Sequence, residues 1–375
     1  MKSATLILKV TNACNLRCKY CYNAATMFNR PVIDPAKVDK MIGILAPFDN
    51  LHIIFHGGEP LMGGIDFFEK VMRIEEKYYA IRGTKFTNSV QTNGTLIDGK
   101  WISFFKKHDF HVGVSFDGIY NDKYRGSTEK VVEAIKRLKK EKLLGGVIAV
   151  ASDPEYDVDA NYEYLKKLGA PLDFNFVFPE GNARSIDLLT NESYTEQILK
   201  LFDKWVHDKD GVPVRSLGIL CHQALDRNVN LCSNGSCIGN FFCIDAEGTI
   251  YGCGREEMKN YAYGNIDSIS SIEDIHKSEG FRKILVGSIR RRDNCSKSCA
   301  YYSECRGGCT DDAILNGDIE HPNEEWCKQY RTLYSHVKEA LAQIKSENVD
   351  LSTLNPCFTR ILIKATGLPE ENADE

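Results

Sequence analysis

The first two thirds of the chain alternate between short apolar runs and amphipathic stretches. Apolar runs typical of strands occupy residues 5–10, 51–55, 85–91, 111–116, 146–151 and 172–178. Between them, apolar residues recur at helical spacing, and we expect helices near 34–45, 66–79, 100–107, 128–140 and 162–168. Strands that alternate with helices favour a parallel sheet, which is either open or closing toward a barrel.

Polar segments that contain cysteine or glycine follow the first four predicted strands. They are the cysteine segment 14–21, then His56-Gly57-Gly58-Glu59-Pro60, Gln91-Thr92-Asn93-Gly94 and Ser115-Phe116-Asp117-Gly118. Functional residues of parallel sheets gather at the carboxyl ends of the strands. Any one of these segments can be an ordinary turn, but the four together predict a functional site at one rim of the sheet.

The segment after the first strand carries three thiols, Cys14, Cys18 and Cys21, spaced C-x₃-C-x₂-C. Thiolates select zinc or iron–sulfur centres. A structural zinc site needs four ligands, and the first histidine of the chain is His52. A 4Fe–4S cube held by three cysteines keeps one iron open to a small molecule. The spacing therefore favours a cluster with a vacant coordination position.

Composition narrows the class of protein. The chain has 375 residues, more than one ordinary domain, with 43% hydrophobic and 26% charged residues. Its formal charge of −5 gives no basic field, so we expect no nucleic acid partner. No apolar run approaches the roughly 20 residues that span a bilayer, and no signal peptide is visible, which predicts a cytoplasmic protein without a membrane partner. Fourteen cysteines in such a chain indicate metal or redox chemistry.

The last third is rich in cysteine and glycine. Eight of its thiols fall into two groups, namely Cys237, Cys243 and Cys253, then Cys295, Cys299, Cys305, Cys309 and Cys327. Eight thiols make two four-cysteine sites, for which two zinc knuckles compete with two further iron–sulfur clusters. Cys221, Cys232 and Cys357 remain, and we expect them to behave as small hydrophobic residues.

The cysteine motif with Tyr20 before its last cysteine, followed by the GGEP sequence at 57–60, resembles the radical S-adenosylmethionine (SAM) superfamily. The resemblance implies an α/β fold, a partial (β/α)₆ TIM-like barrel, in which Cys14, Cys18 and Cys21 hold a 4Fe–4S cluster that SAM chelates. By motif, Glu59 and the backbone around Gly57 and Gly58 would meet the SAM amino group, Ser115 and Asp117 the ribose with Asn93 nearby, and Arg125 the carboxylate. Tyr20 and Pro60 complete the expected cofactor-binding residues.

The resemblance also implies the chemistry. The reduced cluster gives one electron to the SAM sulfonium, and the resulting 5′-deoxyadenosyl radical abstracts hydrogen from an unactivated C–H bond. The protein is then a radical SAM oxidoreductase that supplies orientation and excludes water.

The cysteine-rich region resembles the SPASM extension of radical SAM peptide-modifying enzymes, which holds two auxiliary 4Fe–4S clusters. The resemblance assigns Cys237, Cys243, Cys253 and Cys309 to the nearer cluster and Cys295, Cys299, Cys305 and Cys327 to the farther one, both as electron acceptors. Relatives usually have two residues between the first pair of the knuckle, whereas this chain has three, so we expect a backbone bulge at 296–298, with Cys232 as an alternative ligand.

Domain boundaries follow from the two resemblances. We expect a barrel over 1–228, a SPASM domain over 229–330, and a C-terminal helix with a mobile tail over 331–375. The run Arg290–Arg292 is interpreted as a solvated turn in preference to a patch for a leader peptide or nucleic acid.

The SPASM resemblance points to a peptide or protein substrate. In anaerobic sulfatase maturases an Asp directly follows the third cysteine of the nearer cluster and takes the substrate proton. Here Cys253 is followed by Gly254-Arg255-Glu256-Glu257, so the Asp is absent from its usual position. Either Glu256 or Glu257 takes its role, or both are ordinary surface glutamates. Many thioether-forming relatives carry an extra N-terminal peptide-binding domain. The first strand begins near residue 5, so we expect no such domain.

The favoured function is a peptide maturase that forms a carbon–carbon or carbon–heteroatom crosslink in a ribosomally made precursor peptide. Its expected partners are an electron donor such as flavodoxin or ferredoxin and a separate peptide-carrier protein. The alternative within the superfamily is a sulfatase-maturating enzyme that converts Cys or Ser to formylglycine. The alternative of another class is a non-catalytic iron–sulfur or zinc scaffold.

Overall fold

A curved sheet with helices on its outer face forms the centre of the molecule. The computed structural model describes residues 1–23, 31–225, 232–347 and 349–366. Six parallel strands, each adjacent to the next along the chain, are β1 (Ser3–Thr11), β2 (Asn50–Gly57), β3 (Lys85–Thr92), β4 (His111–Ser115), β5 (Leu144–Ala151) and β6 (Leu172–Phe176). This arrangement confirms the predicted partial (β/α)₆ barrel.

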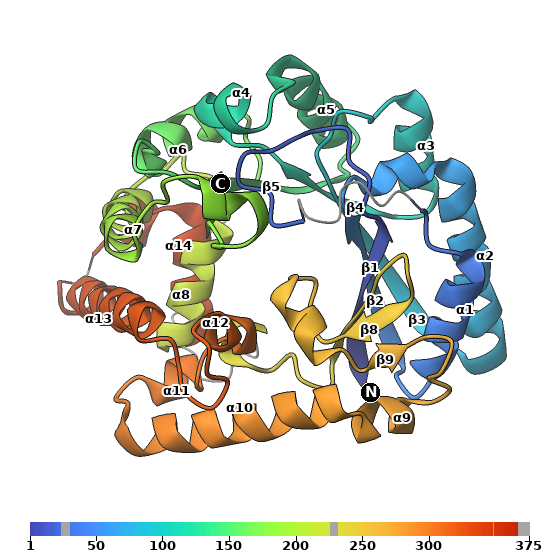
Figure 1. The fold of residues 1–375 in the computed structure, drawn as a ribbon. Coiled ribbons are helices and arrows are strands. Elements are labelled where there is room, and N and C mark those ends of the chain that lie inside the picture. Colours follow the sequence, from blue (N-terminus) through green and yellow to red (C-terminus); the bar gives the residue numbers. More distant parts are fainter. Residues whose placement is uncertain (24–30, 226–231, 348, 367–375) are drawn as a thin grey trace.

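Helices follow the strands and pack outside them, as the ring of coiled ribbons in Figure 1 shows. They are α1 (Pro35–Ile44), α2 (Ile65–Arg82), α3 (Gly99–Lys107), α4 (Asn121–Tyr124), α5 (Thr128–Lys140), α6 (Val158–Lys166) and α7 (Asn191–Val206). Sequence signals fix their starts. Asp34 and Asp98, for example, each accept a backbone N–H of the first turn of α1 and α3, as N-cap residues do.

Side chains along β1 point alternately toward the outer helices and toward the barrel interior. Leu6, Leu8 and Val10 are fully buried in the hydrophobic core, while Ile7 and Lys9 lie on the other face of the strand. A lysine on the inner face is unusual, because a buried ammonium group needs a partner. Lys9 is fully buried all the same.

The cysteine-rich region continues the barrel sheet. Strand β7 (Phe241–Ile244) pairs in parallel with β1, and β8 (Thr249–Tyr251) and β9 (Gly264–Asn265) extend the sheet in antiparallel fashion. The nine-stranded order is β6-β5-β4-β3-β2-β1-β7-β8-β9. The predicted domain boundary near residue 228 falls outside the described residues, and on either side of it the two regions share one sheet.

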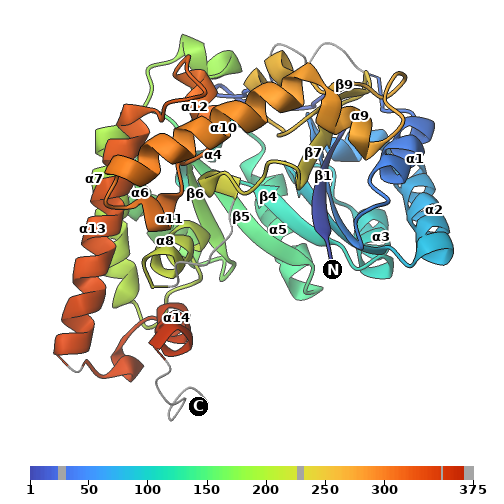
Figure 2. The ribbon, with the colours of Figure 1, turned by 90° about the horizontal axis from the view of Figure 1, so that it is seen from below.

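The remaining helices cover the open side of the barrel. Figure 2 shows the long α10 crossing over the sheet toward α13. These helices are α8 (Arg215–Leu225), α9 (Ile272–Lys277), α10 (Glu279–Ser298), α11 (Tyr302–Cys305), α12 (Thr310–Leu315), α13 (Glu324–Ser346) and α14 (Pro356–Thr366). No helix among the described residues is both long enough and apolar enough to cross a bilayer.

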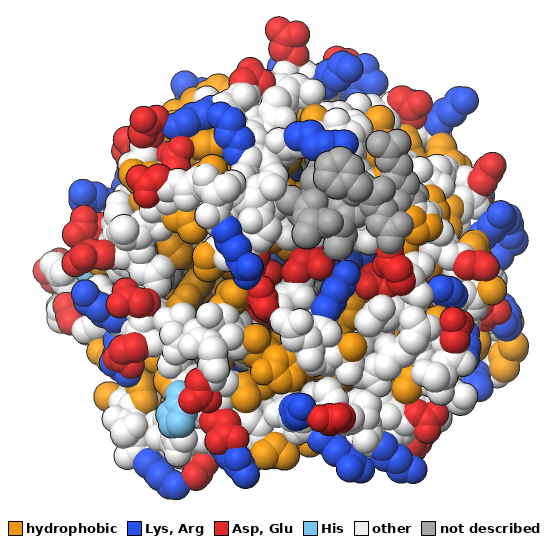
Figure 3. Space-filling view, in the orientation of Figure 1, with side chains coloured by type: hydrophobic (Ala, Val, Ile, Leu, Met, Phe, Trp, Pro, Cys, Tyr) orange, Lys and Arg blue, Asp and Glu red, His pale blue; other side chains and the backbone are white. Residues whose placement is uncertain are grey.

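The surface carries charges of both signs. On the face shown in Figure 3, acidic and basic side chains are interspersed, and hydrophobic side chains are exposed in a hollow left of the centre. Mixed charge on this face agrees with the small net charge of the chain.

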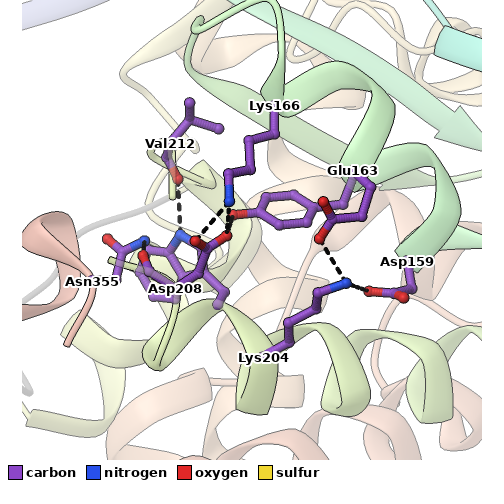
Figure 4. Close-up of polar contacts among 9 residues, drawn as sticks. Asp159, Glu163, Lys166, Lys204, Asp208, Val212 and Asn355 are labelled. Atoms are coloured by element: carbon purple, nitrogen blue, oxygen red, sulfur yellow. Dashed lines mark hydrogen bonds and ion pairs between the residues drawn. The ribbon is translucent and has the colours of Figure 1, made fainter. Parts of the chain in front are cut away.

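Polar contacts fix the C-terminal segment to the barrel (Figure 4). Asp208, which follows α7, accepts hydrogen bonds from Lys166 Nζ at 2.6 and 2.7 Å and from the Tyr162 hydroxyl at 2.8 Å. Asn355 Nδ2 donates to the Asp208 carbonyl oxygen over 3.2 Å, just before α14 begins. Residues 351–353 and 356–366 therefore form short helices in the region expected to be a mobile tail, and the rest of that expected tail, 367–375, lies outside the described residues.

Candidate active site

The three cysteines after β1 lie in one loop and face a cavity of about 270 Å³. Cys18 is buried, and Cys14 and Cys21 are half-buried. Burial is the largest influence on all three thiols and raises their pKa, that of Cys21 to about 11. Such thiols become thiolates through metal binding, which replaces the proton. The donor set fits an iron–sulfur cluster with three protein ligands.

The segment that follows β2 contacts the backbone of the segment that leads into the cysteine loop. Gly58 N donates to the Thr11 carbonyl oxygen, and Glu59 N donates to the Ala13 carbonyl oxygen, both over 2.8 Å. A Cβ on Gly58 would lie 2.2 Å from that same Ala13 oxygen, so only glycine permits this approach. The GGEP segment and the cysteine loop therefore fit together through their backbones.

Glu59 lies behind the cavity wall. Its buried carboxylate accepts hydrogen bonds from Leu61 N (3.0 Å), the Thr92 hydroxyl (2.8 Å) and Asn93 N (2.8 Å). These contacts join the loops after β2 and β3, and Glu59 is not among the residues that line the cavity. The structure thus shows Glu59 as a group that positions the Asn93 backbone, and its predicted contact with SAM stays a prediction.

A buried chain of hydrogen bonds connects the cysteine loop with the loops after β4. The Tyr20 hydroxyl donates to Asp117 Oδ2 over 2.5 Å and accepts from Arg125 Nη1 over 2.6 Å. Asp117 Oδ1 accepts from Val150 N over 3.0 Å. Burial lowers the pKa of Arg125, but Tyr20, Cys18 and Asp117 outweigh that effect and raise it. Arg125 is therefore a fixed cation beside the cysteines.

Most of the predicted SAM-site residues meet in this one cavity. The predicted residues that line it are Cys14, Cys18, Tyr20, Cys21, Gly57, Gly58, Asn93, Ser115 and Arg125. Glu59, Pro60 and Asp117 lie behind them and are not part of the lining. Ile148 and Val150 of β5 also line the cavity.

Sequence reasoning missed the wall that β6 provides. Asn175, Phe176, Val177 and Phe178 line the cavity at the carboxyl end of that strand. The signal was available, because β6 is the sixth predicted strand, but its end carries no glycine or charge. His56 also lines the cavity; its burial lowers the pKa to about 4, and Nδ1 accepts from Gly57 N over 2.8 Å.

Two further cavities are lined by the cysteines of the last third. One, of about 240 Å³, is lined by Cys295, Cys299, Cys305, Cys309 and Cys327. The other, of about 290 Å³, is lined by Cys232, Cys237, Cys253 and Cys309 and shares Asn175, Phe176 and Phe178 with the first cavity. Cys243 is buried on β7 and lies close enough to Cys253 for the two thiols to influence each other's charge. Cys309 lines both cavities, Cys232 lines the second one and Cys243 lines neither, so the predicted ligand sets stay predictions.

Two expectations for this region are wrong. Cys295 lies in the last turn of α10, and Cys299 N donates to its carbonyl oxygen over 2.9 Å. The extra residue of the motif is thus absorbed by a helical turn, where we expected a bulge. Arg291 is fully buried in α10 and donates to the Gly307 and Ile319 carbonyl oxygens and the Thr310 hydroxyl, so the arginine run is not a solvated turn.

Comparison with known proteins agrees with this geometry. The model of the family "Radical SAM superfamily" matches residues 8–152, which include the cysteine loop and the loops after β2, β3 and β4. A cysteine-type anaerobic sulfatase-maturating enzyme of Clostridium novyi (strain NT) is 29% identical over 89% of this chain and 95% of its own length. A serine-type enzyme of that name from Bacteroides thetaiotaomicron is 26% identical over 91% of each chain.

Solved structures show the same relationship. The structure of native anSMEcpe with bound AdoMet and Cp18Cys peptide matches with a TM-score of 0.80 at 25% identity, over 93% of this chain and 100% of that one. Streptococcus suis SuiB bound to precursor peptide SuiA matches with a TM-score of 0.63 at 13% identity over 86% of this chain and 75% of that one, which shows a shared fold. Residues 8–152 therefore form a radical SAM domain, and nearly the whole length of the chain is similar to the anaerobic sulfatase-maturating enzymes.

Proposed function

We propose that this radical SAM peptide or protein maturase is an anaerobic sulfatase-maturating enzyme, which oxidises a cysteine or serine of a sulfatase to formylglycine. The observation that carries the proposal is the match to cysteine-type and serine-type maturases over about nine tenths of the chain. The crosslinking reaction that the sequence favoured has no comparable support, because the likeness to SuiB is one of fold alone. The alternative expectation from the sequence is therefore the better one.

The lining of the cavity after β1 supports this proposal. Cys14, Cys18 and Cys21 would hold the 4Fe–4S cluster of the superfamily, and Arg125 and Ser115 would bind SAM. When the cluster and SAM are bound, they supply a 5′-deoxyadenosyl radical. The protein contributes orientation through the Tyr20, Asp117 and Arg125 contacts.

We call the cavity lined by Cys14, Cys18 and Cys21 the SAM cavity, and the cavity lined by Cys237, Cys253 and Cys309 the inner thiol cavity. The substrate side chain would enter between these two cavities. Phe176 and Phe178 border both cavities, and aromatic side chains there would exclude water from the reacting carbon. The ring of Phe178 carries the Arg255 guanidinium 3.4 Å from its centroid, which fixes the ring at this border.

The two thiol groups would hold auxiliary clusters. We assign Cys237, Cys243, Cys253 and Cys309 to the nearer cluster, and Cys295, Cys299, Cys305 and Cys327 to the farther one. Cys305 supports the second set, because its thiol is influenced by the charges of Cys327, Cys295 and Cys299. An electron donor such as flavodoxin or ferredoxin would reduce the SAM-binding cluster.

Mass spectrometry of treated peptides tests this function. Reconstituted, oxygen-free enzyme with SAM and a strong reductant is incubated with a sulfatase peptide that contains the target cysteine, with its serine form, and with a form in which alanine replaces the cysteine. We expect an aldehyde in place of the cysteine, one 5′-deoxyadenosine per aldehyde, and no reaction of the alanine form. A product that keeps its sulfur in a new intramolecular bond would contradict the proposal and favour a crosslinking enzyme.

A further inference from the structure

The loop after the third cysteine of the inner thiol cavity lacks a carboxylate at its first position. Gly254 follows Cys253, and the first acidic residues are Glu256 and Glu257. Oxidation of a cysteine or serine releases a proton from sulfur or oxygen, and a positioned base accelerates such a transfer. The chain must supply that base from another position.

The structure separates the two glutamates. Glu257 Oε1 pairs with Arg184 Nη2 over 2.6 Å, and the side chains of Glu257 and Arg184 are 25% and 61% exposed. Glu256 has a different partner, because its Oε1 is 2.6 Å from Lys9 Nζ of strand β1. Two ordinary surface glutamates would both point into solvent. Glu256 instead pairs with Lys9 on the inner face of β1.

The partner of Glu256 places it next to the SAM cavity. Lys9 Nζ also donates to Asn23 Oδ1 over 3.2 Å, and Asn23 Nδ2 donates to the Gly57 carbonyl oxygen over 3.1 Å. Asn23 and Gly57 both line the SAM cavity, as does Tyr22, whose hydroxyl is influenced by the charge of Glu256. The carboxylate is thus one residue removed from the wall of the SAM cavity.

Glu256 is held by two cations and is still reachable. Its Oε2 lies 3.3 Å from Lys259 Nζ, and that lysine also pairs with Asp245 over 3.2 Å. The Glu256 side chain remains 19% exposed, while Lys9 beneath it is fully buried. A buried lysine requires a partner, which explains the fixed position of the carboxylate but not its partial exposure.

We propose that Glu256 accepts the substrate proton in this enzyme and that Lys9 is its positioning residue. The inference rests on the proposed function. In the cysteine reaction, a hydrogen atom of the β-carbon passes to the 5′-deoxyadenosyl radical, the S–H proton passes to the Glu256 carboxylate, and one electron passes to an iron–sulfur acceptor. A carbon–sulfur double bond forms, and water replaces the sulfur, which leaves as hydrogen sulfide. In the serine reaction the same losses give the aldehyde directly.

The test compares Glu256→Gln with Glu257→Gln in the reconstituted, full-length enzyme. The probe is a sulfatase peptide whose cysteine carries deuterium on the β-carbon, and both 5′-deoxyadenosine deuteration and aldehyde are measured. We expect Glu256→Gln to keep transferring deuterium while its aldehyde yield per deuterated 5′-deoxyadenosine falls by about 100-fold. Glu257→Gln should keep the wild-type ratio. An unchanged ratio in Glu256→Gln overturns the proposal.

A second pair of variants addresses folding. Removal of Glu256 alone leaves the Lys9 ammonium buried without this partner, so Lys9→Met/Glu256→Gln removes both charges at once. We expect the double variant to fold and still to lack aldehyde, and added formate to restore part of the activity of Glu256→Ala. Recovery of the wild-type ratio in the double variant shows that Glu256 serves only to neutralise Lys9 and overturns the proposal.

The readout also separates this inference from the proposed function. If the wild-type enzyme transfers deuterium but forms a product other than the aldehyde, the proposed function fails. The ratio of that oxidised product to deuterated 5′-deoxyadenosine then still reports on Glu256. If the Glu256 variants lower this ratio, the result supports Glu256 as the proton acceptor. If they leave the ratio unchanged, the result overturns that role.

Discussion

Substitution of Arg125 by glutamine tests the assignment of the SAM cavity most directly. Arg125 Nη1 donates to Tyr20, whereas its Nε is buried without a partner among the described residues. A buried N–H without a partner is costly, and a carboxylate ligand would satisfy it. We therefore expect Arg125 to pair with the SAM carboxylate through at least one further N–H.

The structure sets the size of the effect. A hydrogen bond between charged groups contributes about 1.5–3 kcal/mol, and a two-point contact with a carboxylate brings the loss to about 3 kcal/mol. That corresponds to SAM binding weakened by about 150-fold. Glutamine retains a side-chain N–H, so the contact to the Tyr20 hydroxyl has a replacement donor and the wall of the cavity should persist.

Equilibrium dialysis of SAM against oxygen-free enzyme measures this loss, and decarboxylated SAM provides the decisive comparison. Arg125→Gln should weaken SAM by the expected factor and leave the affinity for decarboxylated SAM almost unchanged. Arg184→Gln, an exposed change in the loop after β6, should alter neither. Equal weakening of both ligands by Arg125→Gln would refute the pairing and leave Arg125 a purely structural cation.

Three further outcomes follow from the described contacts. Burial raises the pKa of Glu75 to about 8, so its contribution to stability is fully present at low pH and is lost as the pH rises through about 8. Glu75→Gln should resist urea better than the wild type at pH 9, by up to about 4 kcal/mol, and equal it at pH 4; a constant difference across pH would contradict this. A Cβ at Gly58 meets a carbonyl oxygen of the cysteine loop, so Gly58→Ala should lower the iron content after reconstitution, whereas Gly99→Ala, which meets nothing within 4 Å, should not. Cys18→Ala should abolish 5′-deoxyadenosine formation, while Cys305→Ala should spare it and stop aldehyde formation; normal aldehyde yield in the second variant would exclude a redox role for the farther site.

The sequence predicted the barrel and most of its site because both depend on local patterns. Each of the six strands was visible as an apolar run, and the carboxyl-end rule brought the cysteine loop, Asn93 and Ser115 together without knowledge of tertiary contacts. Arg125 was found by motif, and it lies in the same cavity.

What the sequence left open depends on contacts between distant residues. Lys9 and Glu256 are 247 positions apart, and only their pairing distinguishes Glu256 from its neighbour Glu257. The burial of Arg291 depends on carbonyl oxygens from two other segments of the chain. A charged residue can be buried when tertiary contacts satisfy it, and a pattern of residue types does not reveal those contacts.

The ladder between β1 and β7 has a mechanical consequence. Thr5 to Leu8 pair with Phe241 to Ile244, so the strand that leads into the SAM-cluster loop and the strand that bears Cys243 are parts of one sheet. Relative motion of the two thiol-bearing regions would break consecutive backbone hydrogen bonds. Electron tunnelling between centres held there would therefore run over a nearly constant separation, and a bound peptide would have to adapt to the enzyme instead of drawing the two regions together.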